Sequence, residues 1–325
     1  MSLYGAAAAV RRELYARGML RSASVSVPVV SVGNLTWGGT GKTPLLAFLA
    51  GDQERRGRRV GIVARGYGRR SRGVVVVSDG ANRLADLAAA GDEPSQLSAR
   101  FPRAIVVVGE ERAAAARRAA DLGAEILLLD DAFQHLALRR DLDIVLVDAA
   151  SPFGGGTPPF GRAREDPSAL SRADLIVVTR DDGNGPSAAD AAVERWSRAP
   201  VFHCRFCFSG WRDAEGSAEL PPGRPLAFCA IGNPGSFRAT LSDAGTEATG
   251  FATFRDHHAY SEADIRRLEE RAAREGAAFL VCTEKDFEKV AGRSRLPLFA
   301  ARIEAQMREP GFADAVESMV AAKRR

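Results

Sequence analysis

The sequence predicts an α/β protein built on a mostly parallel sheet with helices on both faces. Apolar runs of strand length recur along the chain and are nearly continuous rather than alternating, which is typical of strands buried on both faces. Ala- and Arg-rich stretches of helical character separate these runs, as the crossovers between parallel strands require. The runs lie at 59–64, 73–77, 104–109, 125–130, 143–148 and 174–178.

The N-terminal segment, residues 1–24, is predicted to form an amphipathic helix. Its apolar face and its cations are formed by Leu3, Ala7, Val10, Leu14, Arg11, Arg12, Arg17 and Arg21. Such a helix suits attachment to an anionic membrane surface, although the same periodicity fits a helix packed on the protein's own core. No apolar run approaches the roughly 18 residues of a spanning helix, and no signal-peptide pattern is present, so we expect a cytoplasmic protein.

A strand-like stretch at 24–32 leads into a glycine-rich loop and then into a leucine-rich helix. A loop that ends in Gly-Lys-Thr in this context can turn several backbone N–H groups toward one phosphate. Lys42 would reach the β- and γ-phosphates of a nucleotide, and the Thr43 hydroxyl would bind Mg²⁺. Thr36 stands where the usual pattern has its first glycine, so the alternative is a turn that merely precedes a helix. The expected nucleotide-binding residues are Thr36, Gly38, Gly39, Thr40, Gly41, Lys42 and Thr43.

Lysine is rare in this chain, which adds weight to Lys42. Only four of the 45 basic residues are lysines, at positions 42, 285, 289 and 323. Arginine therefore serves almost wherever a positive charge alone is needed. Because an ammonium and a guanidinium are not interchangeable around a phosphate, a lysine at the end of the loop indicates a specific use.

The arginines are concentrated in one stretch. Residues 55–72 hold eight arginines and no acidic residue, although the net charge of the chain is only +4. Such a stretch suits anionic lipid, a phosphorylated substrate or nucleic acid. It contains a single aromatic residue, Tyr67, and no recognisable nucleic-acid-reading module, so we expect no nucleic-acid partner.

Four scattered cysteines are too few for a disulfide framework, which favours a reducing compartment. The spacing from His203 to Cys207 could hold a metal ion. No second Cys-x-x-Cys pair accompanies it, so ordinary buried thiols in a strand are the preferred interpretation.

Two aspartates, Asp130 and Asp131, end the predicted strand at 125–130. Carboxylates at the C-terminal end of a buried strand beside a phosphate-binding loop can hold Mg²⁺ directly or through water. The alternative is that they cap the following turn. Asp148 ends another strand and competes for the metal, although it is not part of a doublet.

Two further strings contain candidate acid–base residues. In Gly-Asp-Glu-Pro (91–94), Asp92 and Glu93 precede a proline at a predicted helix start, where Asp92 alone reads as an N-cap. His257 and His258 precede another predicted helix, and either imidazole could accept or relay a proton near neutral pH. The sequence alone names no spatial partner for either histidine.

The chain of 325 residues is long enough for two domains. A polar stretch rich in Gly and Pro, at 207–225, is the predicted linker. It separates a phosphate-binding (P-loop) domain at 25–206 from a smaller α/β domain at 226–325. Strands of the smaller domain are predicted within 225–233, 250–254 and 277–286.

Together these motifs resemble those of the lipid A 4'-kinases (tetraacyldisaccharide 4'-kinases), and the resemblance runs nearly from end to end. It is carried by the loop VGNLTWGGTGKTP and by ARGYGRRSRG, GDEPSQLSAR, VGEERAAAA, LLLDDAFQH, GRAREDPSALSRADLIVVTR, FRDHHAYSEADI and TEKDFEKV. A loop with threonine in place of the first glycine is peculiar to that family. One departure is Ala132, where the family usually has glycine.

The resemblance implies transfer of the γ-phosphoryl group of ATP to the 4'-hydroxyl of an acylated glucosamine disaccharide 1-phosphate, the membrane-embedded precursor of lipid A. In that family the aspartate matching Asp92 acts on the acceptor hydroxyl, assisted by the histidine matching His257. The expected catalytic residues are Lys42, Asp92 and His257, the Mg²⁺ ligands are Thr43, Asp130 and Asp131, and the substrate or phosphate contacts are Glu93, Arg112 and Arg164. ATP and Mg²⁺ are the implied cofactors, and the implied location is the cytoplasmic face of the bacterial inner membrane, as a peripheral protein.

The residues alone leave two other classes open. A P-loop GTPase or metal-insertion chaperone would carry a guanine-reading motif, which the string VVTRDD matches only loosely, with Arg180 in place of lysine. A non-catalytic membrane-binding module would need neither the loop nor the acidic doublet. Measuring ATP and GTP consumption with and without the lipid disaccharide separates the three classes.

Overall fold

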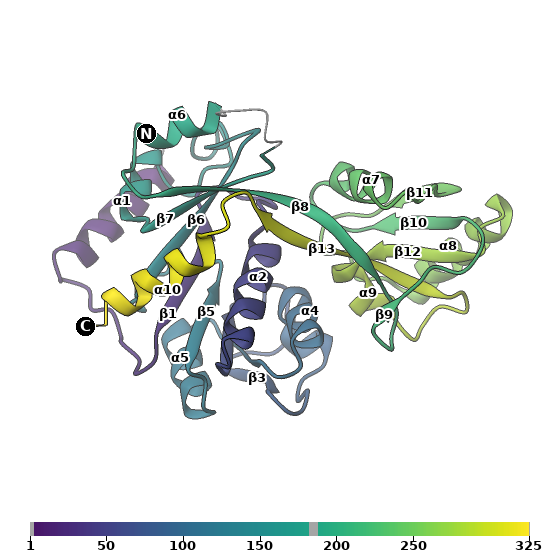
Figure 1. Cartoon of the computed structure of the whole chain (residues 1–325), viewed down its shortest axis with the longest axis horizontal. Helices are drawn as coiled ribbons and strands as arrows, with labels where there is room; N and C mark the ends of the chain where they lie inside the picture. The colour runs from purple at the N-terminus through teal and green to yellow at the C-terminus, as the bar shows by residue number, and fades with distance from the viewer. Residues whose placement is uncertain (1–2, 182–187, 325) are drawn as a thin grey trace.

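The computed structural model describes residues 3–181 and 188–324 (Figure 1). In chain order, its elements up to the seventh strand are α1 (Leu3–Ala16), β1 (Val29–Asn34), α2 (Lys42–Arg55), β2 (Val60–Ala64), β3 (Val75–Asp79), α3 (Leu87–Ala90), α4 (Asp92–Arg100), β4 (Ile105–Val108), α5 (Arg112–Asp121), β5 (Ile126–Asp130), β6 (Leu142–Asp148), the 3₁₀ helix η1 (Pro167–Arg172) and β7 (Leu175–Thr179). The elements that follow are α6 (Ala188–Glu194), β8 (Val201–Arg212), β9 (Ser217–Ala218), β10 (Pro225–Cys229), α7 (Pro234–Asp243), β11 (Gly250–Thr253), α8 (Glu262–Glu275), β12 (Phe279–Thr283), α9 (Glu284–Val290), β13 (Leu298–Met307) and α10 (Phe312–Ala322).

The strands form one continuous sheet in the order β11-β10-β12-β13-β8-β7-β6-β1-β5-β2-β4-β3, with β9 paired to β8 outside this path. Most neighbours are parallel, which confirms the predicted fold class. Two pairings are antiparallel along the path: β3 against β4 at one edge, and β13 against β8 in the middle. The first five residues of β1, β2 and β5 are buried throughout, as their near-continuous apolar sequences predict.

The sheet has two halves joined by a long ribbon. We call β8 with β13 the ribbon, the strands from β7 to β3 with their helices the larger half, and β10 to β12 with α7 to α9 the smaller half. Figure 1 shows the ribbon crossing from one half to the other, with its two strands side by side. Backbone hydrogen bonds join the two strands along most of their length, with one register shift between Arg302 and Ile303, so the ribbon is the main covalent and hydrogen-bonded link between the halves.

Helices cover both faces of each half. In the larger half, α2 and α10 pack on one face of the sheet and α5 packs on the other. In the smaller half, α8 and α9 pack on one face and α7 on the other. This layering buries the apolar faces of the parallel strands, as the fold class requires.

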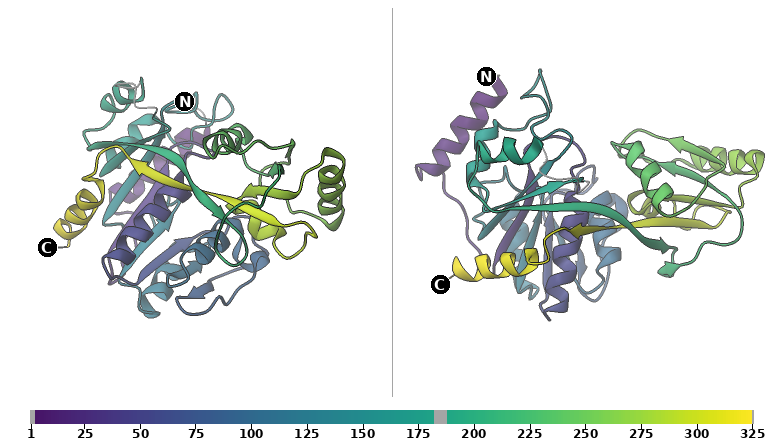
Figure 2. Two further views of the ribbon diagram at one scale, coloured as in Figure 1. Left: turned by 45° about the vertical axis from the view of Figure 1, so that its right-hand side comes forward. Right: turned by 45° about the horizontal axis from the view of Figure 1, so that its top comes forward.

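The last helix departs from the predicted domain limits. The sequence predicts one unit at 226–325, whereas α10 returns to the larger half (Figures 1 and 2). Its side chains Phe312, Val316 and Val320 are buried in the core of that half. The reason is the direction of β13, which runs antiparallel to β8 and so carries the chain back. The predicted linker at 207–225 also begins inside β8. We propose that the smaller domain ends with β13.

The N-terminal helix lies along the outside of the larger half (Figure 2). Val10 on its surface is 61% exposed, and Arg12 approaches Glu165 to 3.9 Å. Within residues 3–181 and 188–324, no helix combines the length and the apolar character needed to cross a bilayer.

Candidate active site

The glycine-rich loop joins β1 to α2 and turns at glycines with positive φ. The φ angles are 121° at Gly38 and 88° at Gly41. A Cβ atom at Gly41 would lie 1.9 Å from Cζ of Phe206 in β8, so only glycine fits there. Lys42 begins α2, and Pro44 lies in the first turn, where its missing N–H costs little. The N-terminus of α2 therefore opens onto the loop, as a phosphate site requires.

Side chains and backbone brace this loop. Asn34 Nδ2 donates a hydrogen bond of 2.9 Å to Thr40 Oγ1, which joins the end of β1 to the far side of the loop. Thr36, 7% exposed, forms an antiparallel bridge with Ala163. Because Thr36 lies in a bridge and has no positive φ, a threonine is tolerated where the usual pattern has glycine.

Asp131 lies between two cations just after β5. Lys42 Nζ is 3.7 Å from Asp131 Oδ1, and Arg164 Nη1 donates to both carboxylate oxygens at 2.7 and 2.8 Å. Burial alone would raise the pKa of Asp131, but the charges of Lys42 and Arg164 hold it below its ordinary value. Asp131 is therefore a carboxylate that holds the side chains of Lys42 and Arg164 in place.

Asp130, the last residue of β5, is 5% exposed. Burial and the negative charges of Glu93 and Asp131 raise its pKa to about 7, and the charges of Lys42 and Arg112 oppose this only in part. A divalent cation beside Asp130 would offset the cost of burying this charge. Carboxylate and hydroxyl oxygens are ligands that Mg²⁺ prefers, so the residues present fit Mg²⁺. Within the described ranges, no three His, Cys, Asp or Glu side chains are grouped as a metal cage.

Arg112, the first residue of α5, is 4% exposed, and its Nη1 donates to the Gly109 carbonyl at 2.8 Å. Burial lowers the pKa of its guanidinium to about 10, although the nearby charges of Asp130 and Asp131 favour the charged form. The group therefore stays cationic near neutral pH. Its buried Nε has no hydrogen-bond partner among the described residues, which leaves one donor for an anionic ligand.

Asp92 and His257 meet across the two halves. Asp92 begins α4, and His257, in the loop before α8, has a φ of 59°; Nδ1 of the imidazole lies 3.0 Å from Asp92 Oδ2. The Tyr67 ring packs against the imidazole with its centroid at 5.0 Å. Burial would raise the pKa of Asp92, but the hydrogen bond from His257 and the ammonium groups of Lys289 and Lys285 hold it below its ordinary value.

No role for the two lysines of α9 is predicted from the sequence, yet both lie at this pair. Lys289 Nζ is 2.8 Å from Asp92 Oδ2, and Lys285 Nζ is 3.2 Å from His257 Nε2. The available signal was their rarity, because these are two of the four lysines in the chain. Their spacing of four residues on a short helix also indicates that they share a face.

Two candidates take other roles. Asp148, the competing metal ligand, pairs with Arg180, which also donates to the carbonyl oxygen of Gly39 in the loop. Arg180, which the GTPase alternative placed in a guanine-reading motif, thus braces the loop. His258 lies 3.2 Å from Asp264 Oδ2, so it serves the start of α8, and His257 alone of the two reaches Asp92.

The His203 to Cys207 spacing does not bring metal ligands together. His203 contacts Asp190 and Glu309, each at 2.9 Å. Cys204 is buried, and burial raises the pKa of its thiol to about 12, which disfavours a metal-binding thiolate.

The strand β2 runs through the arginine-rich stretch 55–72, so the two parts of the stretch lie at opposite ends of this strand. Residues 55–59 lie at the C-terminal end of α2, where Arg58 pairs with Glu317 of α10 at 2.6 Å. Residues 65–72 follow the C-terminal end of β2, on the side of the sheet where the phosphate-binding loop follows β1. The stretch therefore does not form the single basic patch that its sequence suggests.

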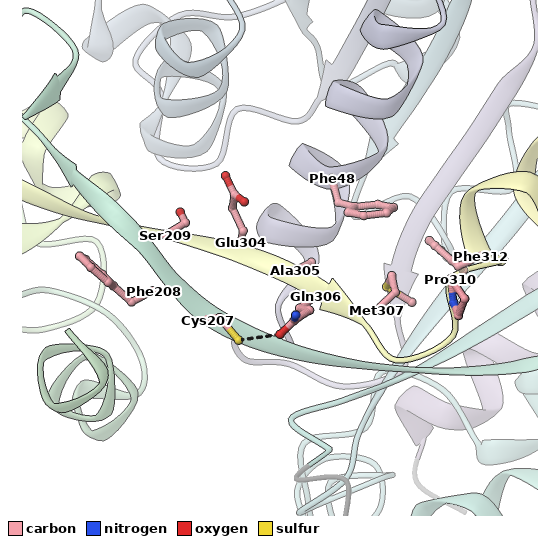
Figure 3. A pocket seen from close by; sticks show the side chains of 10 residues that line it. All are labelled: Phe48, Cys207, Phe208, Ser209, Glu304, Ala305, Gln306, Met307, Pro310 and Phe312. Carbon is pink, nitrogen blue, oxygen red and sulfur yellow. Dashed lines mark hydrogen bonds between the residues drawn. The ribbon is translucent and has the colours of Figure 1, made fainter. Parts of the chain in front are cut away.

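A pocket of about 420 Å³ lies between α2 and the ribbon (Figure 3). Its apolar wall includes Phe48, Met307 and Phe312, and its polar rim includes Glu304 and Gln306. Its lining contains no residue of the glycine-rich loop, the acidic doublet or the Asp92–His257 pair, so the pocket is separate from these groups.

The two groups of charges lie beside each other, because Glu93, next to Asp92, acts electrostatically on Asp130. A phosphate-binding loop with a lysine, a buried acidic strand end and an adjacent acid–base pair define a P-loop phosphotransferase. Residues 1–321 match the family described as Tetraacyldisaccharide-1-P 4'-kinase. The chain belongs to this family and is a kinase, so the GTPase and membrane-module alternatives are wrong.

Relatives and a solved structure agree with this assignment. The Tetraacyldisaccharide 4'-kinase of Anaeromyxobacter sp. (strain Fw109-5) is 43% identical over 319 residues, which cover 94% of this chain and 85% of the relative. The protein of the same name from Chlorobaculum parvum is 39% identical and covers 98% and 91%. The crystal structure of LpxK from Aquifex aeolicus, an "apo" form in complex with ATP, matches with a TM-score of 0.82 and 30% identity, covering 99% of this chain and 96% of that one.

Proposed function

We propose that this kinase transfers the γ-phosphoryl group of ATP to the 4'-hydroxyl of the acylated glucosamine disaccharide 1-phosphate that precedes lipid A. Family membership supports the substrate, since the relatives carry the name tetraacyldisaccharide 4'-kinase. The observation that carries the mechanism is the contact of 3.0 Å between His257 and Asp92 next to the acidic end of β5. It supplies an acid–base pair for an acceptor hydroxyl beside a site for the donor.

The donor is held by the phosphate-side cluster, which we define as Lys42, Thr43, Asp130, Asp131 and Arg164. Backbone N–H groups of residues 38–43 surround the β-phosphate, and Lys42 reaches the γ-phosphoryl group from its place beside Asp131. Thr43 and Asp130 are the proposed direct Mg²⁺ ligands. Asp131, also expected as a ligand, is paired with Lys42 and Arg164, so we propose that it acts on the ion through water. When bound, Mg²⁺ offsets the negative charge that develops on the phosphate oxygens. Positioning and charge stabilisation of this kind carry most of the rate in phosphoryl transfer.

The acceptor is activated by the acceptor-side cluster, which we define as Asp92, His257, Lys285 and Lys289. The described contacts of the Asp92 carboxylate with His257 and Lys289 fall on Oδ2, which leaves Oδ1 for the 4'-hydroxyl. Oδ1 accepts the hydroxyl proton as the new O–P bond forms and the bond to ADP breaks. A base placed in this way contributes roughly 10²- to 10⁴-fold to the rate.

Charged residues between the clusters contact phosphate or substrate in this proposal. Arg112 has a buried guanidinium with a spare donor, so it suits the transferred phosphoryl group. Arg164 contacts the same group while its Nη1 holds Asp131. Glu93 acts electrostatically on Asp130. It is the proposed substrate contact beside the Mg²⁺ that Asp130 would hold.

A membrane surface is the proposed partner of the N-terminal helix. Val10, Met19 and Leu20 are 61%, 69% and 39% exposed, so this segment presents apolar side chains that the protein does not cover. Cations of the same segment can meet anionic lipid on the cytoplasmic face of the inner membrane, each contributing about 1 kcal/mol. The lipid substrate would then be reached from the surface where it resides. We propose no nucleic-acid partner.

The test is product formation by the purified full chain with the disaccharide 1-phosphate in mixed micelles. We expect a 4'-phosphorylated product that requires ATP and Mg²⁺, measured by mass spectrometry and ³¹P NMR. GTP in place of ATP should give little product. A folded protein that consumes ATP without modifying the disaccharide would contradict the proposal.

A further inference from the structure

The two lysines of α9 are placed by local structure of the smaller half. The Thr283 side chain caps the helix by accepting a hydrogen bond from the backbone of Asp286. Four residues separate Lys285 from Lys289, so both side chains leave the same face of the helix. That face meets α4 of the larger half, where Asp92 begins the helix. The side chains of Lys285 and Lys289 are 14% and 4% exposed.

The contacts form a series in which hydrogen-bond donors and acceptors alternate. Lys289 Nζ lies 2.8 Å from Asp92 Oδ2 and 3.8 Å from Asp286 Oδ1. Lys285 Nζ lies 3.2 Å from His257 Nε2 and 3.0 Å from Asp256 Oδ1. His257 closes the series through its Nδ1, which faces Asp92. Each lysine in this series thus touches an aspartate, and the imidazole of His257 lies between Asp92 and Lys285.

We propose that Lys285 and Lys289 are positioning residues of this kinase: Lys289 holds Asp92 as an oriented carboxylate, and Lys285 fixes His257 as the neutral tautomer with its proton on Nδ1. This inference rests on the proposed function, because it assigns how the acceptor-side cluster is prepared. It also gives a use to two of the four lysines in an arginine-rich chain.

The tautomer follows from donor and acceptor chemistry. An ammonium group has three donors and no acceptor, so at 3.2 Å from Lys285 the His257 Nε2 atom must accept. The proton of a neutral imidazole then sits on Nδ1, where it is donated to Asp92 Oδ2. A doubly protonated imidazole would place an N–H and a positive charge against the ammonium, which is unfavourable. His257 is therefore a fixed hydrogen-bond donor that orients Asp92.

The role of Lys289 follows from burial. A carboxylate at the interface of two helices loses hydration, and burial favours its protonated form. The Lys289 ammonium contacts Oδ2 of Asp92, the same oxygen that accepts the hydrogen bond from His257. Both groups therefore hold the same side of the carboxylate. A guanidinium, being planar and longer, would not reproduce this single contact in so little space.

The ionisation of Asp92 depends on groups from every packed element. Glu93 lies beside it on α4, Asp256 and His257 lie in the loop before α8, and the Tyr67 ring covers the imidazole. The remaining groups, all on α9, are Lys285, Asp286 and Lys289. Among the lysines and arginines of the described ranges, only Lys289 touches Asp92 directly. Removing its charge should therefore raise the pKa of Asp92 and move the acidic limb of the kcat/KM profile to higher pH.

The first experiment compares Lys289→Met, Lys289→Arg and the matched control Lys323→Met in the full chain. We expect Lys289→Met to lower kcat by about 10²-fold with KM for ATP unchanged, and to move the acidic limb upward by about one pH unit or more. Lys289→Arg should restore the position of the limb but only part of kcat. Lys323, which pairs with Asp174 at the far end of the chain, should tolerate methionine.

An unmoved pH profile in Lys289→Met, with activity lost only in proportion to folded protein, would mean that the lysine serves stability alone and would overturn the proposal. If that variant does not fold, the decision falls to the second experiment.

The second experiment reads the tautomer of His257 by ¹⁵N NMR without substrate, with the resonances assigned by their loss in His257→Gln. We expect a proton on Nδ1 in the wild-type chain, and mixed tautomers or an imidazolium in Lys285→Met. A wild-type proton on Nε2, or an unchanged tautomer in Lys285→Met, overturns the proposal. Because this measurement involves no phosphoryl transfer, it is separate from failure of the proposed activity, which would appear as a wild-type chain without product.

Discussion

The carboxylates Asp131 and Asp92 are both held by cations, but the cations reach them by different routes. Asp131 is contacted by Lys42 from α2 and by Arg164 from the loop before η1, all within the larger half. Asp92 is contacted by groups that arrive from the smaller half. The phosphate-side cluster therefore needs only one half of the sheet, whereas the acceptor-side cluster exists only when the two halves are in contact.

This difference predicts that the two clusters can be damaged separately. Changes in the glycine-rich loop should abolish phosphoryl transfer whether or not the two halves are in contact. Changes at the contact between α4 and α9 should spare ATP binding and weaken the handling of the acceptor.

The largest effect should come from Lys42→Ala. In the proposed mechanism this ammonium stabilises charge on the transferred phosphoryl group, so we expect kcat to fall by about 10³-fold or more. The fold should survive, because Arg164 still neutralises Asp131. Steady-state transfer assays and circular dichroism check both expectations. Near-normal turnover in the folded variant would contradict the role of the whole phosphate-side cluster.

The next effect concerns Asp92→Asn, His257→Gln and the double variant. If the two residues act as one unit, each single change should cost roughly 10²- to 10⁴-fold in kcat, and the double variant should be little worse than the poorer single one. ATP binding by calorimetry should be unchanged in all three. Independent losses that multiply in the double variant would show that the two residues do not work together.

A smaller effect is expected where the halves are joined away from the clusters. Arg100 of α4 donates to the carboxylate of Glu284 in α9 at 3.2 Å, and the Glu284 side chain is only 3% exposed. Arg302 and Arg212 still lie 3.4 and 3.8 Å from the Glu284 carboxylate, so its charge stays partly compensated in Arg100→Ala. Loss of the Arg100 hydrogen bond to this charged group should destabilise the protein by about 1 to 3 kcal/mol. Denaturant unfolding measures this, and Arg103→Ala, 78% exposed at its side chain, is the matched control.

In the same Arg100→Ala variant, kcat with the lipid acceptor should fall while KM for ATP stays constant. A rise in KM for ATP would break the proposed separation of the two clusters.

Deletion of residues 1–20 should have the smallest effect on kcat and on thermal stability. This change should weaken binding to anionic liposomes and raise the apparent KM for bilayer-presented acceptor, with little change in KM for ATP. Liposome flotation and a melting curve on one truncated protein decide the matter. A large drop in Tm with intact liposome binding would mean that α1 is a core helix.

The same contrast explains what the sequence predicts and what it does not. Lys42, Asp130 and Asp131 are predictable because the carboxyl ends of neighbouring parallel strands meet at one edge of a sheet. The pairing of Asp92 with His257 spans 165 positions in the chain and was expected only through family resemblance. Lys289 was missed because helical spacing identifies a face but not the helix that covers it.

Two misjudged features share a second cause. The basic stretch 55–72 is continuous in sequence, but β2 lies inside it and places its two parts at opposite ends of the strand. The stretch 226–325 looks like one unit, but the ribbon reverses the chain so that α10 leaves it. In both cases residues that are close in sequence are separated in space, because the direction of a strand determines where the residues on either side of it lie.

The return of α10 also bears on how the chain is synthesised and folds. Phe312, Val316 and Val320, which follow the smaller half in the chain, complete the same core that contains Val30 and Leu46, which precede it. A ribosome therefore releases the entire smaller half before the larger half can close its core. Until then the apolar face of the sheet that α10 covers is open to solvent and to other chains. A nascent chain arrested before residue 308 should consequently bind chaperones that recognise exposed apolar surface, even though every residue of its nucleotide loop has already been made.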